Sequence, residues 1–150
     1  MNRIKFIEYA APIVKKQGKL ILPSLILSQI IIEGFNGESL STLGDAPNYN
    51  LFGIKGEGTN GHVQILTHEI INGKSVPTYA NFRKYHNWEE SIKDHYDLLT
   101  KSSRYKALIG ERDIVKAATK IWAAGYCTNP KYPELIQNVV KSYSLQRFDK

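Results

Sequence analysis

The 150-residue sequence predicts a single domain of the α+β class that is mainly helical, with a helical body and one small β-hairpin. Apolar residues recur at helical spacing in several segments, and two β-rich runs flank an Asn-Gly pair near the middle of the chain. Hydrophobic residues make up 42% of the chain and charged residues 23%, which supports a packed core and is unlike a disordered chain. No linker, repeat or low-complexity tract divides the sequence, so residues 1–150 are expected to form one domain.

Two helices are predicted near the start of the chain. Apolar residues at helical spacing favour a helix over residues 3–17, which Gly18 can end. A second helix is predicted over residues 23–33, because Pro23 is tolerated in a first turn and Gly34 can supply a left-handed residue at the C-terminal end. Apolar side chains surround this second helix almost completely, which is typical of a buried central helix.

The middle of the chain carries a hairpin signal. Asn72-Gly73 separates β-rich runs over residues 62–71 and 75–85, and Asn-Gly favours a tight two-residue turn. Pro77 restricts the second run to a sheet edge or a bulge. The other predicted elements are a loop with short helical turns over residues 34–61, a helix that is capped near Asn87 and runs through Leu99, a helix from Ile114 to Ala124 between Asp113 and Gly125, and a last helix from about Pro133 to Tyr143.

Charge, cysteine and histidine content exclude several classes of site. The net charge is +6, but the basic residues are scattered, so a solvated basic surface is favoured over a nucleic-acid site. Cys127 is the single cysteine, which excludes an internal disulfide, and a buried structural thiol is favoured over a peptidase nucleophile. The four histidines lack metal-ligand spacing and no nucleotide fingerprint is present, so we expect no metal and no cofactor. The longest apolar stretch, residues 20–32, is too short to span a bilayer.

Glu33 ends the otherwise apolar second helix, directly after Ile31 and Ile32. Burial of a carboxyl group disfavours its charged form and raises its pKa, and the negative end of the helix dipole acts in the same direction. Both effects suit a general acid that must stay protonated near neutral pH. The alternative is a glutamate that turns outward at the helix end and is merely solvated. The pattern alone favours neither.

Five segments carry motifs in a fixed order. They are Ser24, Leu25, Gln29, Glu33 and Gly34 in the second helix, residues 50–55 (NLFGIK), residues 67–69 (THE), residues 82–85 (FRKY) with Ser91 and Ile92, and residues 125–132 (GYCTNPKY). Together they resemble the motifs of family 73 glycoside hydrolases, which are bacterial and phage peptidoglycan N-acetylglucosaminidases. The chain departs from the family pattern at Cys127, where Ala is usual, at Asn129, where Asp is usual, and over residues 34–37, where GFNG replaces S-G-W-G.

The resemblance implies a lysozyme-like fold, in which a cleft separates the helical body from the small hairpin lobe. It also implies hydrolysis of the β-1,4 bond after N-acetylglucosamine in peptidoglycan, with Glu33 as the general acid. Glu69 is the candidate second carboxylate, which would help water to attack or stabilise positive charge at the sugar. Without the resemblance, Glu69 reads as an exposed strand residue. Tyr126 would lie beside the reacting sugar, and the fallback acids are Glu38, Asp45 and Glu57.

Peptidoglycan glycan strands are the expected partner, with no nucleic acid, no membrane insertion and a monomeric protein. The sequence carries no signal peptide, so we expect a holin-released or virion-associated phage lysin, or a fragment of a secreted protein that acts on the bacterial cell wall. A muramidase or lytic transglycosylase on the same fold stays open, as does a non-catalytic wall-binding module. The candidate substrate-binding residues are Gln29, Asn50, Phe52, Tyr85 and Tyr132, the three aromatic ones as cleft walls or core.

Overall fold

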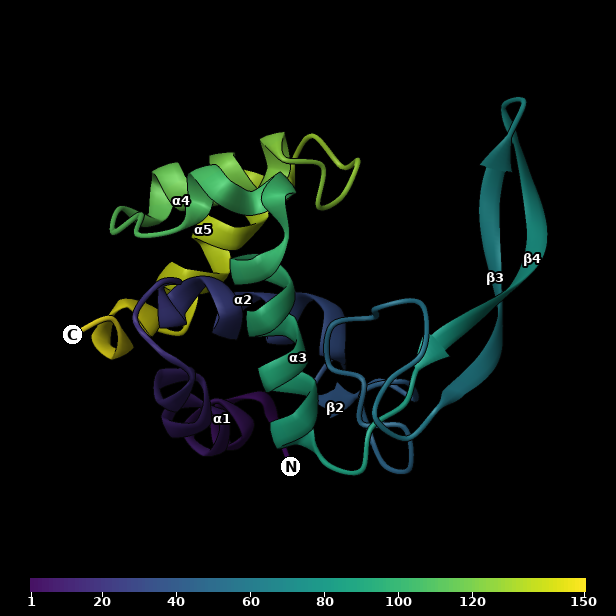
Figure 1. The fold of residues 1–150 in the computed structure, drawn as a ribbon, viewed down its shortest axis with the longest axis horizontal. Helices are drawn as coiled ribbons and strands as arrows, with labels where there is room; N and C mark the ends of the chain where they lie inside the picture. Colours follow the sequence, from purple (N-terminus) through teal and green to yellow (C-terminus); the bar gives the residue numbers. More distant parts are fainter.

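The computed structural model describes all residues from 1 to 150 and shows a helical body from which one long β-hairpin projects (Figure 1). This arrangement confirms the predicted α+β class, and each predicted helix is present, with ends that agree with the prediction to within two residues. The helical elements are α1 (Arg3–Gln17), α2 (Pro23–Gly34), α3 (Trp88–Lys101), η1 (Ser103–Leu108), α4 (Ile114–Ala123), α5 (Tyr132–Ser142) and η2 (Leu145–Phe148).

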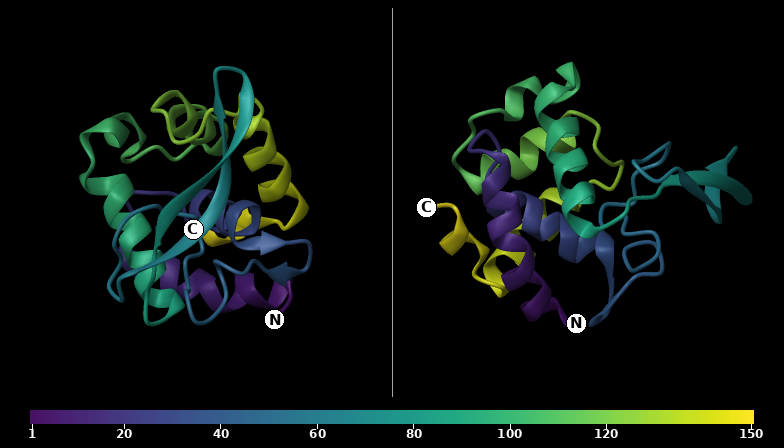
Figure 2. Two further views of the ribbon diagram at one scale, coloured as in Figure 1. Left: turned by 90° about the vertical axis from the view of Figure 1, so that its right-hand side faces the viewer. Right: turned by 60° about the horizontal axis from the view of Figure 1, so that its bottom comes forward.

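Helix α2 is the centre of the body, as its apolar composition predicts. Ten of its twelve residues are buried, and it packs against α1, α4, α5 and η2 (Figures 1 and 2). Pro23 occupies the first turn, where its missing N–H costs no hydrogen bond. A helix held on all sides in this way gives its last turn a fixed position, which is where Glu33 lies.

Gly34 corrects one expectation about how α2 ends. It does not adopt a positive φ, and the chain instead leaves the helix through Phe35 in an extended conformation. The position needs glycine for a different reason: a Cβ on Gly34 would lie 2.9 Å from the backbone oxygen of Leu51. Gly44 approaches Gly34 as closely, because its own Cβ would lie 2.9 Å from the Gly34 oxygen. The end of α2 is therefore clamped by backbone from two later loop segments.

The segment over residues 34–61 differs from the predicted loop with helical turns. It contains two short paired strands, β1 (Phe35–Asn36) and β2 (Ser39–Leu40), followed by turns and irregular backbone. Gly37 has a φ of 64° at the first position of the two-residue connection, where a tight hairpin turn favours glycine. Strands of two residues carry no detectable period, so the pattern could not reveal them.

The long hairpin confirms the Asn72-Gly73 prediction. Strands β3 (His62–Ile71) and β4 (Lys74–Arg83) pair antiparallel around Asn72 and Gly73, whose φ values are 52° and 77°. Positive φ at both positions is the geometry of a type I′ turn. Pro77 pairs opposite His68 in a sheet of only two strands, so it lies at an edge as expected.

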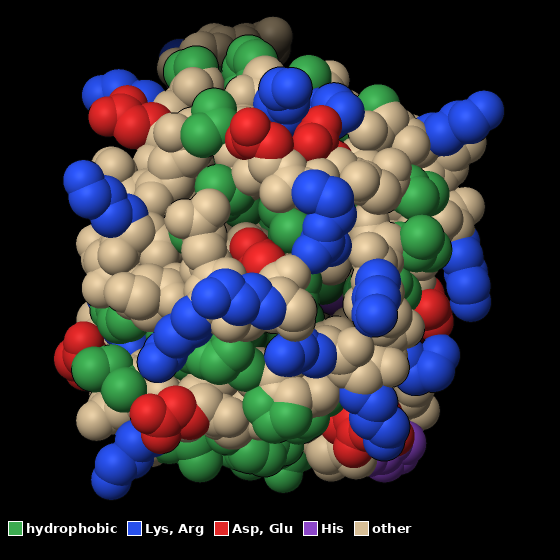
Figure 3. All heavy atoms as spheres, turned by 90° about the vertical axis from the view of Figure 1, so that its left-hand side faces the viewer, with side chains coloured by type: hydrophobic (Ala, Val, Ile, Leu, Met, Phe, Trp, Pro, Cys, Tyr) green, Lys and Arg blue, Asp and Glu red, His purple; other side chains and the backbone are tan.

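The face of the molecule opposite the hairpin carries scattered charge (Figure 3). Figure 3 shows the face opposite the hairpin, where Lys and Arg side chains are spread widely and interspersed with acidic ones. None of the helices is both long enough and apolar enough to cross a membrane.

Candidate active site

A pocket of about 270 Å³ opens where the end of α2 meets the loop after Asn50, helix α3 and the loop after α4. Glu33 is the only carboxylate in its wall, and most of the other lining side chains are apolar or aromatic. The lining residues are Glu33, Phe52, Gly53, Ile54, Leu98, Tyr105, Tyr126 and Cys127. A single acid in an apolar wall is the environment in which a carboxyl group retains its proton.

Glu33 is exposed to solvent at the pocket surface, yet it is crowded by the protein atoms of the pocket wall. This desolvation raises the pKa of its carboxyl group above the ordinary glutamate value. The negative end of the α2 dipole lies nearby and acts in the same direction. The carboxyl forms no hydrogen bond or ion pair within the protein, so no partner stabilises its charged form. The sequence left open whether Glu33 is buried or solvated, and the structure shows features of both. Its side chain reaches solvent, but within a concave and mostly apolar site.

Tyr126 lies in the same pocket wall as Glu33. Helix α4 stops just before Gly125, whose φ of 90° turns the chain back so that Tyr126 faces the pocket. Burial raises the pKa of Tyr126 well above its ordinary value, and the charges of Tyr132 and Glu33 act in the same direction. The hydroxyl group is therefore neutral at any working pH and can donate a hydrogen bond.

Phe52 and Cys127 complete the part of the wall nearest Glu33. Phe52 is only 4% exposed and lines the pocket. Cys127 is half-buried and lines the pocket, so the expectation of a buried structural thiol is corrected. Burial raises the pKa of the Cys127 thiol, which keeps it protonated and a poor nucleophile.

Four of the candidate substrate-binding residues do not reach the pocket surface. Gln29 and Tyr85 are 0% exposed, Asn50 is 1% exposed and Tyr132 is 2% exposed. In this conformation none of them offers surface to a ligand. Their side chains instead make hydrogen bonds that hold the elements around the pocket together.

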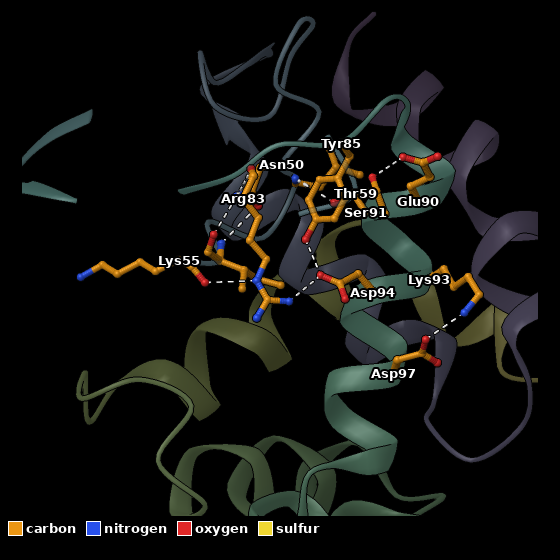
Figure 4. Close-up of polar contacts among 12 residues, drawn as sticks. Asn50, Lys55, Thr59, Arg83, Tyr85, Glu90, Ser91, Lys93, Asp94 and Asp97 are labelled. Carbon is orange, nitrogen blue, oxygen red and sulfur yellow. Dashed lines mark hydrogen bonds and ion pairs between the residues drawn. The ribbon is translucent and has the colours of Figure 1, made fainter. Parts of the chain in front are cut away.

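Asn50 and Tyr85 belong to a polar network at the base of the hairpin, drawn in Figure 4. The amide nitrogen of Asn50 donates to the backbone oxygens of Ile54 and Arg83, both at 2.9 Å. The Tyr85 hydroxyl donates to Asp94 of α3 at 2.6 Å, and Arg83 donates to the same carboxylate oxygen at 2.7 Å. This network fastens β4 to α3 and to the pocket loop. Asp94 carries no motif, so the sequence did not single it out.

Glu69 lies outside the pocket wall. It is on the half-buried face of β3 and forms an ion pair with Lys55, whose nitrogen is 3.1 Å from its carboxylate oxygen. Both side chains are about half exposed. The fallback acids are also elsewhere: Glu38 and Asp45 border a separate surface depression, and Glu57 contacts His62. The structure therefore brings Glu33 and Tyr126 together but leaves Glu69 on the hairpin.

The larger concavity of the molecule lies elsewhere. A groove of about 570 Å³ runs between α4, α5 and η2, and its wall contains basic and amide side chains but no carboxylate. It offers no group that could act as an acid, so the pocket at Glu33 is the better candidate for chemistry despite its smaller volume.

Comparison with known proteins by sequence and by structure points to one family. The sequence model of the glucosaminidase family, described as mannosyl-glycoprotein endo-beta-N-acetylglucosaminidase, matches residues 8–145. The exo-glucosaminidase LytG of Bacillus subtilis is 35% identical over 134 residues, which cover 86% of this chain and 46% of LytG. A probable N-acetylmuramidase of Lactococcus lactis is 33% identical over 147 residues, which cover 93% of this chain and 32% of that protein.

The structural comparison gives the same result. The catalytic domain of the autolysin Auto from Listeria monocytogenes aligns with a TM-score of 0.83 at 29% identity, and the alignment covers 98% of this chain and 87% of that domain. The chain spans less than half the length of the two relatives compared by sequence. From the family match and from the order of its motifs, this chain belongs to the glucosaminidase family, the family 73 glycoside hydrolases.

Proposed function

We propose that this chain is a cell-wall hydrolase that cleaves the β-1,4 bond after N-acetylglucosamine in peptidoglycan, with Glu33 as the general acid. The observation that carries the proposal is the position of Glu33: it is the single carboxylate in a mostly apolar pocket, its pKa is raised by desolvation, and a neutral tyrosine hydroxyl lies in the same wall. Family membership supports the class of bond.

Cleavage of a glycosidic bond requires a proton on the leaving oxygen and stabilisation of positive charge on the sugar. Protonated Glu33 would donate that proton, and the raised pKa of its carboxyl group favours the protonated form that this role needs. Tyr126 would hydrogen-bond the reacting sugar through its hydroxyl, because its raised pKa keeps that group protonated. Phe52 and Tyr105 would supply apolar walls against the sugar rings.

Glu69 is proposed as the second carboxylate, which activates water or stabilises the oxocarbenium-like transition state. Glu69 lies on the half-buried face of the hairpin, whereas Leu66 and Ile70 lie on the face that is exposed. To act at the pocket it must leave the exposed ion pair with Lys55, and exposed ion pairs contribute little to stability. Movement of the hairpin toward the body would bring the two carboxyl groups together.

Peptidoglycan lies outside the cytoplasmic membrane, so we place the site of action at the cell wall. The chain would reach the wall as a holin-released or virion-associated phage lysin, or as part of a larger secreted protein.

Muramidase or lytic transglycosylase activity is the alternative. The Lactococcus relative carries the name of an N-acetylmuramidase, and the pocket wall holds one carboxylate rather than two. A transglycosylase works with a single acid and leaves anhydro sugar ends, so the chemistry of the product ends separates the three reactions.

The role of Glu33 is tested by Glu33→Gln, which preserves the shape of the side chain but cannot donate the proton. We expect a folded protein whose clearing of a peptidoglycan suspension is near background. Glu38→Gln is the matched control, because Glu38 is exposed and outside the pocket, and it should retain wild-type activity. Activity of Glu33→Gln within a few-fold of wild type would remove Glu33 as the acid.

A further inference from the structure

Three buried polar side chains from three helices form a chain beside the pocket. Gln29 of α2 stands in the middle, His95 of α3 on one side and Tyr132 of α5 on the other, and none is more than 2% exposed. The distance from His95 Nε2 to Gln29 Oε1 is 2.8 Å, and Gln29 Nε2 donates to the Tyr132 hydroxyl oxygen at 3.1 Å. The sequence gives no hint of this chain, because its members are 66 and 103 residues apart.

The two outer side chains of the three, His95 and Tyr132, each contact an aromatic residue of the pocket wall. The His95 ring stacks flat on Phe52, with 3.8 Å between ring centroids and an interplanar angle of 10°. The Tyr132 ring stacks on Tyr126 at 5.7 Å. Burial raises the pKa of Tyr132 and of Tyr126, and the charge of Glu33 contributes to both shifts, so both hydroxyls lie within electrostatic reach of Glu33. A change in the position of His95 or Tyr132 would therefore move the pocket residues Phe52 or Tyr126, on which they stack.

The hydrogen bonds that link His95, Gln29 and Tyr132 can run in either of two directions. The two arrangements differ only in which proton each group carries and in which of the two amide positions of Gln29 holds the oxygen. In the first, His95 Nε2–H donates to the Gln29 oxygen and the Gln29 amide donates to Tyr132, which leaves the hydroxyl proton of Tyr132 free. In the second, Tyr132 donates to Gln29, Gln29 donates to a bare His95 Nε2, and the ring proton moves to Nδ1. Burial lowers the pKa of His95 to about 3, so the neutral ring holds a single proton, either on Nε2 or on Nδ1.

The free nitrogen of His95 favours the first direction. Its Nδ1 is buried and has no hydrogen-bond partner. In the first direction the groups without a partner are the Nδ1 lone pair and the Tyr132 hydroxyl proton, which can rotate about its C–O bond toward an acceptor. In the second direction the group without a partner is an Nδ1–H group, which the ring holds in one direction. Unpaired buried N–H groups are the rarer and costlier defect in proteins. On this argument His95 carries its proton on Nε2, and the hydrogen bonds are donated in sequence from His95 to Gln29 and from Gln29 to Tyr132.

We propose that His95 is a positioning residue of this enzyme: its Nε2–H fixes the direction of the hydrogen bonds through Gln29 to Tyr132 and so leaves the hydroxyl proton of Tyr132, whose ring stacks on Tyr126, free to donate elsewhere, while the His95 ring supports Phe52. The proposal deepens the function proposed for Glu33 and rests on it. His95 and Gln29 touch no substrate, so their loss should slow the chemical step without weakening glycan binding.

The first test is made on the wild-type protein and does not depend on activity. Nitrogen-15 NMR of histidine-labelled protein reports which ring nitrogen carries the proton. We expect the Nε2–H form for His95 from pH 8 down to about 4.5, with no titration in that range. An Nδ1–H form, or titration near the ordinary histidine pKa of about 6.5, overturns the proposal even if Glu33 is confirmed as the acid.

The second test separates positioning from stability. His95→Phe keeps an aromatic ring against Phe52 but removes the donor, and we expect kcat on a soluble glycan strand to fall on the order of 10-fold, with KM within about twofold of wild type. His95→Gln places an amide donor near the former Nε2 and should recover part of the loss. The matched control is Tyr96→Phe on the same helix, which removes a buried hydroxyl that accepts from the Leu20 backbone at 3.2 Å.

The Tyr96→Phe control should lower thermal stability while kcat stays within about twofold of wild type, because Tyr96 contacts α1–α2 connection backbone and not the pocket. The proposal is overturned if His95→Phe keeps wild-type kcat, if His95→Gln is no faster than His95→Phe, or if kcat and KM change together in proportion to the loss of stability. Glu33→Gln, measured beside them, shows separately whether the proposed function holds. If His95→Phe does not fold, the proposal is still tested by the NMR measurement on the wild-type protein and by the kcat and KM of His95→Gln.

Discussion

At the scale of single residues, the active-site account depends on the environment of one carboxyl group. The pattern of the second helix placed Glu33 at its end but could not say whether the side chain faced core or solvent, because the last turn of a helix can do either. The structure shows a third arrangement, in which loop residues and Tyr126 build a concave wall around a side chain that still reaches solvent. Those wall residues come from distant parts of the chain, so no local pattern describes them.

The raised pKa of Glu33 has a consequence for stability. A carboxyl group whose pKa is higher in the folded than in the unfolded state contributes stability that is present below the unfolded pKa of about 4.3 and is lost as the pH rises through the folded pKa. Glu33→Gln does not titrate and escapes this loss. We therefore expect Glu33→Gln to have a higher Tm than wild type at pH 7, with the difference vanishing below about pH 4. Thermal melts from pH 4 to pH 8 measure this, and equal Tm values at pH 7 would show that the carboxyl group is fully solvated.

Glu69 gives a second prediction at the residue scale. If it activates water, Glu69→Gln should abolish turnover without weakening glycan binding, and added azide should restore part of the rate. Lys55→Gln is an informative companion, because it removes the ion-pair partner and leaves the carboxyl group in place, so it should retain most of the activity. The measurement is turnover of soluble glycan strands with and without azide. Substrate assistance or a transglycosylase route becomes the better account if Glu69→Gln keeps most of its activity.

At the scale of elements, the sequence was most informative where one segment decides its own structure. The helices follow from apolar spacing, and the Asn72-Gly73 turn follows from the positive φ that both residues adopt. It was least informative where two segments meet. Gly34 is required by its approach to Leu51, and Tyr85 leaves β4 to reach Asp94, so the predicted end of that strand at residue 85 moved to residue 83.

The hairpin turn can be tested separately from the helical body. Gly73→Val puts a β-branched residue at a φ of 77°, which costs roughly 1–2 kcal/mol in local strain, although no atom lies within 4 Å of the new Cβ. Because the hairpin adds no residue to the main hydrophobic core, we expect activity to fall more than Tm. Ser75→Val is the control with the same side chain at an exposed strand position. A large loss of Tm with normal specific activity would count against a separate lobe.

At the scale of the whole molecule, the lysozyme-like arrangement places one acid in the helical body and the candidate second carboxylate on a hairpin that projects from it (Figure 1). The sequence motifs predicted this division, because the five segments of the family pattern fall on both parts. The motifs could not predict that Glu69 pairs with Lys55 and lies outside the pocket wall, since the base of the hairpin is joined to α3 through Asp94, which belongs to no motif. Catalysis on this account requires the body and the hairpin to approach.

Product analysis of digested peptidoglycan tests the central claim most directly. Purified wall material is digested with the wild-type protein and with Glu33→Gln, and the released fragments are identified by mass spectrometry after reduction of their ends. The account predicts fragments that end in reducing N-acetylglucosamine from the wild-type protein and no fragments above background from Glu33→Gln. Fragments that end in N-acetylmuramic acid or its anhydro form, or an equal yield from Glu33→Gln, would contradict it.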